Sequence, residues 1–156
     1  MAKVYLETSF FSACVSTRTG AKNVGWKASS LEWWHKERKK HELFISAEVI
    51  RELSSPAFKN REAALAMIRE PSVIVIADAT YQLAQHLVEE KVMPGPAVEG
   101  DAIHVALSIL NRIEYILSWN VKHLANPAKI THLGVICLKL GMAPPRIVTP
   151  DMLVGD

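Results

Sequence analysis

The alternation of short apolar runs with longer amphipathic stretches constrains this fold more than any other feature of the sequence. The two patterns alternate about five times at intervals of roughly 30 residues, which is typical of βαβ units. Strands are expected at 3–6, 43–45, 73–76, 115–118 and, at a sheet edge, 146–148; helices are expected at 26–40, 47–53, 58–69, 78–88, 101–110 and 127–140. The sequence therefore predicts an α/β protein with a central parallel sheet of four or five strands flanked by helices.

Several local signals refine this outline. The run from Val73 to Ile76 holds four β-branched residues without polar alternation, which favours a strand covered on both faces. The small polar residues at 17–23 are expected to form a loop, and Gly141 is expected to end the last helix. In parallel sheets of this kind, ligands bind beyond the carboxyl ends of the strands, where the strand order reverses.

Length and composition fit a single globular domain over residues 1–156. With 49% hydrophobic and 22% charged residues and a net charge of +2, electrostatics alone does not predict nucleic-acid binding. Cys14 and Cys137 belong to no CxxC pair, so we expect two inert packing thiols in a reducing cytoplasm. Glu7 interrupts the N-terminal segment before a signal-peptide length of apolar residues accumulates, and no run is long enough to span a membrane.

Acidic and amide side chains follow the predicted strands. Glu7 comes directly after the first strand, Glu52 lies in the helix after the second, Asp101 opens the helix before the fourth, and Asn120 follows that fourth strand. Carboxylates without a counter-charge raise one another's pKa, so a cleft holding Glu7, Glu52 and Asp101 is best explained by a bound divalent cation. Oxygen ligands alone favour Mg²⁺ or Mn²⁺ over zinc.

Each of these residues also has an ordinary structural explanation. Asp101 is a normal helix N-terminal acid, Glu52 and Glu48 resemble solvated helix side chains, and Asn120 suits a turn after a strand. Glu7 is harder to explain in this way, because a carboxylate ending an apolar strand needs a partner. The hypothesis of a metal site therefore depends on the four residues together.

Four segments in this order resemble a PIN domain, most closely the branch that contains VapC-type toxins. They are Tyr5-Leu6-Glu7-Thr8-Ser9, Ile45-Ser46 with Glu52-Leu53, Gly100 to Ala106, and Ile116 to Asn120 with His123 to Asn126. The resemblance spans nearly the whole chain. It implies a Rossmann-like α/β/α sandwich and a metal-dependent ribonuclease acting on single strands, commonly a homodimer and commonly neutralised by a small antitoxin.

Carried over by position, the resemblance makes Glu7, Glu52, Asp101 and Asn120 the metal-binding and catalytic residues. Two of them depart from the usual pattern, because Glu7 and Asn120 each stand where the family usually has Asp. The extra methylene of Glu7 is expected to move its carboxylate away from the strand, and Asn120 removes one negative charge. The small hydroxyl residue beside the first acid corresponds to Thr8 or Ser9.

The leading hypothesis is therefore a Mg²⁺- or Mn²⁺-dependent endoribonuclease that hydrolyses RNA phosphodiester bonds, the toxin of a type II toxin–antitoxin pair. Substrate contacts are expected from Thr8, Ser9, His104, Ser118 and Trp119, although His104 equally suits a buried structural role. The alternatives are a catalytically weak PIN-like module that binds RNA or protein, and a phosphohydrolase acting on small esters.

A basic run near two tryptophans has two interpretations. Lys36, Arg38, Lys39 and Lys40 follow Trp33 and Trp34 and either bind an RNA backbone with stacked bases, or form a solvated face with inward tryptophans. His123, close to Asn120, is a candidate for the rim of the cleft.

Overall fold

A five-stranded, entirely parallel sheet organises the computed structural model, which describes residues 1–155. The strands are β1 (Lys3–Leu6), β2 (Glu42–Ser46), β3 (Ser72–Ile74), β4 (Tyr115–Leu117) and β5 (Arg146–Val148), in the spatial order β3-β2-β1-β4-β5. The register places Leu6 beside Leu117, and Tyr5 beside both Phe44 and Ile116. Because the chain moves outward from β1 in one direction and then returns to its other side with β4, the order reverses between these two strands.

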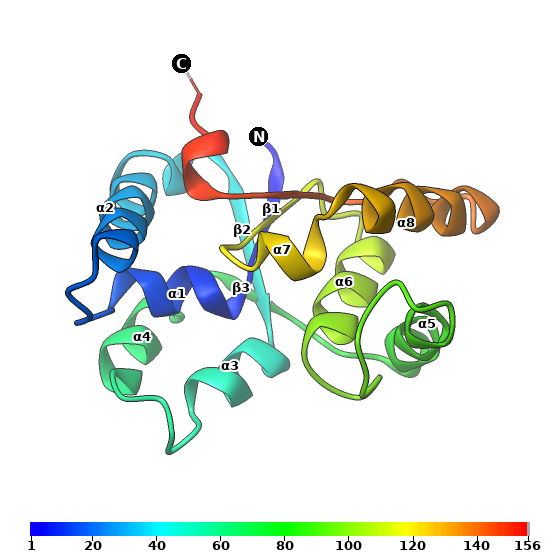
Figure 1. Cartoon of the computed structure of the whole chain (residues 1–156), viewed down its shortest axis with the longest axis horizontal. Coiled ribbons are helices and arrows are strands. Elements are labelled where there is room, and N and C mark those ends of the chain that lie inside the picture. Colours follow the sequence, from blue (N-terminus) through cyan, green and yellow to red (C-terminus); the bar gives the residue numbers. More distant parts are fainter. Residues whose placement is uncertain (156) are drawn as a thin grey trace.

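Helices cover both faces of this sheet and confirm the predicted α/β architecture (Figure 1). In that view α1, α2 and α4 lie on one side, and α5, α6 and α8 on the other; α1 packs against α2 and α4, and α5 packs against α6. The helices are α1 (Thr8–Cys14), α2 (Ala21–Lys36), α3 (Ala47–Leu53), α4 (Arg61–Met67), α5 (Asp78–Glu89), α6 (Asp101–Leu110), α7 (Val121–Leu124) and α8 (Pro127–Lys139), with 3-10 turns η1 (Arg38–Lys40) and η2 (Pro150–Met152).

The hydrophobic core joins the sheet to helices on both faces. Every residue of α6 from Ala102 to Ile109 is buried, including the polar His104 and Ser108. Trp33 and Trp34 are buried against Phe10 on the other side of the sheet. The inward reading of these two tryptophans is therefore correct, and they are not available to stack on bases.

The basic run after these tryptophans is largely neutralised within the chain. Lys36 pairs with Glu32, Arg38 with Glu70, and Lys40 with the buried Glu37. Arg38 also packs over the Trp34 ring. The basic run lies just before β2, at the amino ends of the strands. It is therefore at the other end of the sheet from the residues that follow the carboxyl ends.

The structure corrects the predicted burial of the third strand. β3 lies at the sheet edge, where Val73 is 52% exposed and the following Val75 is 81% exposed. A β-branched run indicates a strand, but it does not by itself distinguish a central strand from an edge strand, because β-propensity depends on the neighbouring side chains. The expected edge position of β5 and the end of α8 before Gly141, whose φ is +68°, are confirmed.

Several element boundaries also differ from the prediction. α2 begins at Ala21 and ends at Lys36, so the expected loop at 17–23 is shorter and the expected helix at 26–40 is shifted. The helix expected at 58–69 covers only 61–67, and α1 and α7 were not predicted. None of the helices within residues 1–155 is long and apolar enough to cross a membrane.

Candidate active site

The candidate site lies at the carboxyl ends of β1 and β4, on either side of the point where the strand order reverses. Glu7 directly follows β1, and its backbone N–H donates to the Leu117 carbonyl at 3.1 Å. Ser118 directly follows β4, and its N–H donates to the Val148 carbonyl at 2.9 Å. The sheet ladder therefore continues one residue beyond each strand and fixes both residues beside each other.

The Glu7 carboxylate is buried and fully engaged by hydroxyl and amide donors. Only 5% of Glu7 is exposed. Its Oε1 accepts hydrogen bonds from Ser9 Oγ and Ser118 Oγ, both at 2.6 Å, and its Oε2 accepts from the Ser9 N–H at 3.0 Å. Glu7 is thereby the N-cap of α1. The sequence analysis expected the extra methylene to move this carboxylate away from the strand; in the structure the side chain folds back onto the first turn of α1.

Glu52 belongs to a second hydrogen-bonded chain that runs into the core. Its Oε1 accepts from Thr8 Oγ1 at 2.8 Å and lies 2.6 Å from His104 Nε2. His104 Nδ1 lies 2.6 Å from the Tyr5 hydroxyl, which lies 2.8 Å from Ser46 Oγ. Five elements, β1, β2, α1, α3 and α6, are joined by this chain.

The electrostatics of this chain favour a charged pair. Burial raises the pKa of Glu52, but the hydrogen bond and charge of His104 outweigh it, so the pKa of Glu52 is lowered overall. Burial lowers the pKa of His104, but the hydrogen bond to Glu52 and the charge of Glu7 raise it above its ordinary value. An imidazolium donating from both nitrogens satisfies Glu52 and Tyr5 together.

Asp101 and Asn120 form the third part of the site. Gly100, with φ +69°, turns the chain so that Asp101 opens α6, and Asn120 is the N-cap residue of α7. Asn120 Nδ2 lies 3.4 Å from each carboxylate oxygen of Asp101. Burial, followed by the charge of Glu7, raises the pKa of Asp101, with a further contribution from Glu52.

Glu48 is part of this neighbourhood and was missed at the sequence level, where it was taken as a solvated side chain. It is buried, and it accepts two hydrogen bonds from Arg51, at 2.7 and 2.8 Å. Its other contact is the backbone N–H of Gly100. The local sequence around Glu48 is the same for a buried glutamate as for an exposed one. Only the contact with Gly100, which is distant in the sequence, shows that Glu48 is buried.

The remaining predicted residues lie at different depths. Ser118 and His104 are fully buried, and each donates to or lies within hydrogen-bond distance of a carboxylate, so the buried structural role considered for His104 fits its position. The substrate contacts predicted for both stay a prediction. Thr8 and Ser9 are half-buried beside Glu52 and Glu7. Exposed His123 lies in α7, close to Asn120 in the chain.

Trp119 connects the site to α2. Its ring stacks on Trp26 with centroids 4.8 Å apart and an interplanar angle of 12°. Its indole N–H donates to Ser30 Oγ at 2.7 Å, and its backbone N–H donates to Ser9 Oγ at 2.8 Å. Trp119 therefore fixes the turn that carries Asn120 rather than standing free at the rim.

The donor set suits a hard divalent cation in kind. Three carboxylates and an amide oxygen are the ligands that Mg²⁺ and Mn²⁺ prefer, and in residues 1–155 no lysine or arginine forms an ion pair with Glu7, Glu52 or Asp101. Within the same residues no group of three or more His, Cys, Asp or Glu side chains is placed so that it could hold a metal ion. The carboxylates are held by internal hydrogen bonds, yet near enough for their charges to raise the pKa of Asp101.

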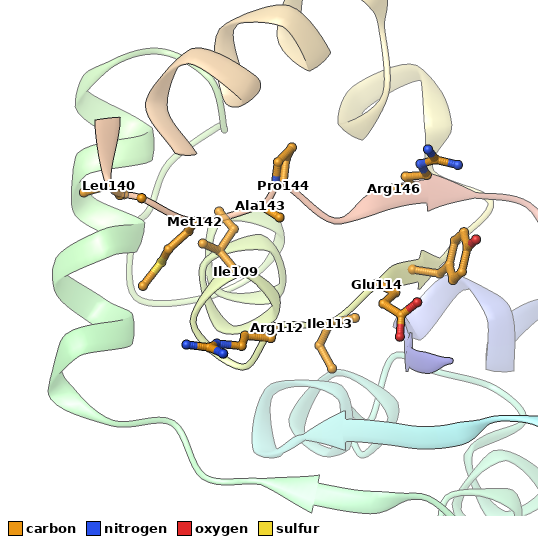
Figure 2. Close-up of a pocket in the computed structure, with 11 residues that line it drawn as sticks. Ile109, Arg112, Ile113, Glu114, Leu140, Met142, Ala143, Pro144 and Arg146 are labelled. Atoms are coloured by element: carbon orange, nitrogen blue, oxygen red, sulfur yellow. The ribbon is translucent and has the colours of Figure 1, made fainter. Parts of the chain in front are cut away.

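A hollow lies at the opposite end of the sheet from the candidate site. It has a volume of about 730 Å³ and lies by the amino ends of β4 and β5, where Arg112, Glu114 and Arg146 line it together with apolar residues such as Ile109 and Met142 (Figure 2). None of the predicted site residues lines it. With a single carboxylate, it lacks the oxygen cluster that marks the candidate site.

Comparison with known proteins agrees with this geometry at the level of the fold. Neither a known sequence-family model nor a curated protein matches the chain significantly. Among solved structures, VapBC2 from Rickettsia felis, bound to a promoter DNA fragment, matches with a TM-score of 0.58 and 13% identity over 94% of this chain and 98% of that one. FitAcB from Neisseria gonorrhoeae matches with a TM-score of 0.58 and 9% identity, over 96% and 99% of the two chains.

A third structure is VapC20 from Mycobacterium tuberculosis, a toxin that cleaves the sarcin–ricin loop. It matches with a TM-score of 0.55 and 20% identity, over 75% of this chain and 89% of that one. Together with the parallel sheet and the helices on both faces, these matches show a PIN-domain fold. Within that class the fold is VapC-like, as the sequence motifs predicted.

Proposed function

We propose that this protein is an endoribonuclease that requires Mg²⁺ or Mn²⁺ and acts as the toxin of a toxin–antitoxin pair. The observation that carries the proposal is the meeting of Glu7, Glu52, Asp101 and Asn120 around the ends of β1 and β4 in a VapC-like fold. These residues lie at a strand switch point, which is where α/β folds bind ligands. VapC20 supports an RNA substrate, since it is a toxin that cleaves RNA at the sarcin–ricin loop.

The cation would be held by oxygens of Glu7, Glu52, Asp101 and Asn120. When bound, it supplies the activation of water and the neutralisation of developing phosphate charge that hydrolysis needs. Hydrolysis by in-line attack of water leaves a 5′-phosphate and a 3′-hydroxyl. Within the chain, Ser9 and Ser118 orient Glu7, and Thr8 and His104 orient Glu52.

The test is cleavage of defined RNAs with and without added Mn²⁺. We expect fragments with 5′-phosphate ends in Mn²⁺, none in EDTA, and a loss of at least about 100-fold in rate for Asp101→Asn. Asp78→Asn is the matched control, because Asp78 is an exposed acid in the first turn of α5. Cleavage that persists in EDTA, or equally in Asp101→Asn, contradicts the proposal.

One observation favours a second candidate, a PIN-like module that binds RNA or protein without efficient cleavage. Glu7 accepts three hydrogen bonds, and Asn120 contributes no charge, so the affinity for a cation is reduced. Calorimetric titration with Mn²⁺ separates the two: the absence of binding at millimolar concentrations selects the binding module.

The VapBC2 and FitAcB structures support a protein partner, and we expect a small antitoxin that covers the carboxylates. We also expect a homodimer, which the sequence resemblance implies, in the cytoplasm. Growth arrest on expression of the chain, relieved by the product of the neighbouring reading frame, tests the first expectation. Light scattering of the purified protein tests the second.

A further inference from the structure

A second hollow adjoins the carboxylate site, and it is lined by cationic rather than acidic side chains. Its volume is about 470 Å³, and it is formed by the end of α1, the loop after it, the start of α2 and the loop between α3 and α4. The polar and aromatic residues that matter for its chemistry are Ser9, Arg18, Asn23, Trp26, Lys59 and Asn60. We refer to this hollow as the α1–α2 groove.

The α1–α2 groove is cationic on its exposed rim. Arg18 and Lys59 are exposed, and no acidic residue lines the groove within residues 1–155. In the same part of the chain neither Arg18 nor Lys59 forms an ion pair. These two contrast with the run at 36–40, in which three of the four cations are paired with carboxylates.

The groove is physically continuous with the carboxylate site through one residue. Ser9 lines the groove, donates its hydroxyl to Glu7, and accepts the Trp119 N–H on the same oxygen. Trp26 also lines the groove and stacks on Trp119, and the Lys22 ammonium lies 4.4 Å from the centroid of the Trp26 ring. A ligand in the groove therefore lies directly beside the turn that carries Asn120.

A cluster of carboxylates repels a polyanion, so the affinity for RNA must come from neighbouring cations. Phosphate contacts supply most of the non-specific affinity for nucleic acids, and a groove of this size accommodates a short segment of one strand. Because the faces of Trp26 are covered by Trp119 and Lys22, base stacking on that ring is not what the groove provides.

We propose that the α1–α2 groove binds the backbone of single-stranded RNA next to the bond to be cut, with Arg18 and Lys59 on consecutive phosphates and the amides of Asn23 and Asn60 facing the nucleotides. The assignment rests on the proposed ribonuclease function and adds the position of the substrate. It also places the strand on the α1 side of the carboxylates.

The test is binding of a labelled single-stranded RNA to the Asp101→Asn protein, measured by fluorescence anisotropy in Mg²⁺ across a salt series. In this background Arg18→Ala/Lys59→Ala is compared with Lys39→Ala/Lys139→Ala, which removes two exposed cations at the opposite end of the sheet. We expect the groove pair to weaken binding about 10- to 100-fold and to reduce the salt slope by about 1.4, since each phosphate contact on a single strand contributes about 0.7. The control pair is expected to change neither.

Equal effects of the two pairs overturn the groove assignment. Poly-glutamate that competes as strongly as unlabelled RNA also overturns it, because the groove would then bind an acidic protein segment. Thermal unfolding of each variant confirms that it is folded. The two proposals fail in different ways. If only the ribonuclease proposal is wrong, the protein does not cleave RNA, but Arg18→Ala/Lys59→Ala still weakens RNA binding. Cleavage by the wild type without that loss leaves the ribonuclease standing and removes the groove.

Discussion

At the scale of single residues, the candidate site consists of carboxylates oriented by hydroxyl donors and by one buried histidine. Glu7 is held by Ser9 and Ser118, and Glu52 by Thr8 together with the buried His104. Hydrogen bonds to charged groups contribute about 1.5–3 kcal/mol each to stability, more than neutral pairs. The residues behind the carboxylates therefore matter as much for the shape of the site as the carboxylates themselves.

Glu48→Gln tests a residue that touches no predicted ligand. The substitution weakens the paired hydrogen bonds to Arg51 and the grip on Gly100, from which α6 and Asp101 begin. We expect a loss of about 1–3 kcal/mol in the free energy of unfolding, measured in urea, and weaker Mn²⁺ binding by calorimetry. Glu99→Gln is the control, because Glu99 is half exposed and meets Arg51 at only 3.5 Å; equal effects of the two changes contradict the prediction.

The reactivity of Cys14 provides a test that is independent of function. Burial raises the pKa of the Cys14 thiol to about 12, so the thiol stays protonated at pH 8. Since the thiolate is the reactive form, we expect no alkylation of Cys14 in the native protein and rapid alkylation in urea. Mass spectrometry after brief treatment at pH 8 measures both; modification of the native protein at the unfolded rate would show that the thiol is accessible.

At the scale of elements, Trp119 holds the turn after β4 against α2. The ring stacks on Trp26 while its indole N–H satisfies the fully buried Ser30. Because α2 and β4 are far apart in the sequence, this contact fixes the turn and Asn120 from outside the sheet. The same contact borders the α1–α2 groove, which Trp26 lines.

A double-mutant cycle between Trp26 and Trp119 measures this contact. We expect Trp26→Ala and Trp119→Ala to be non-additive, with a coupling energy of about 0.5–1.5 kcal/mol from the aromatic pair. Urea unfolding gives the energies, and the near-ultraviolet circular dichroism of the stacked rings is expected to fall in each single variant. Trp119→Phe retains a ring but leaves Ser30 without its donor, so it isolates the hydrogen bond. Strictly additive losses in the cycle would mean that the stack contributes nothing.

Strand positions and the parallel class were predictable because each strand of three to five residues carries its own apolar signal. α1 and α7 were not, since α1 is capped by the side chain of Glu7 and α7 has only four residues. The order of the strands predicted the position of the candidate site. The motifs predicted four oxygen ligands, and that role stays a prediction. Glu48, Ser30 and Trp26 were missed because their roles depend on contacts across the chain, which leave no local pattern.

At the scale of the whole molecule, α6 is the central support. It is buried along nearly its full length, packs against α5, and contributes both His104 and Asp101. The core and the site therefore share one element, so a loss of packing in α6 disturbs both. This arrangement explains a helix of ten residues with almost no polar face.

Leu107→Ala tests the role of α6 in stability. Leu107 is fully buried, and replacing such a leucine by alanine costs about 2–5 kcal/mol from lost transfer energy and the cavity left behind. Leu138→Ala is the matched control: Leu138 in α8 is 79% exposed, and its replacement is expected to change the unfolding free energy by less than about 0.5 kcal/mol. Urea denaturation compares them, and similar losses at the two positions would contradict the burial described here.

The division of the site between the two halves of the sheet has a consequence for synthesis of the protein. Glu7 and Glu52 come from the first third of the chain, whereas Asp101 and Asn120 come with α6 and with the turn after β4. A polypeptide still emerging from the ribosome therefore lacks the complete set of four candidate residues until β4 has joined β1. Under the proposed function, RNA cleavage by the nascent chain becomes possible only in the last third of translation, and the proposed antitoxin has that interval in which to bind.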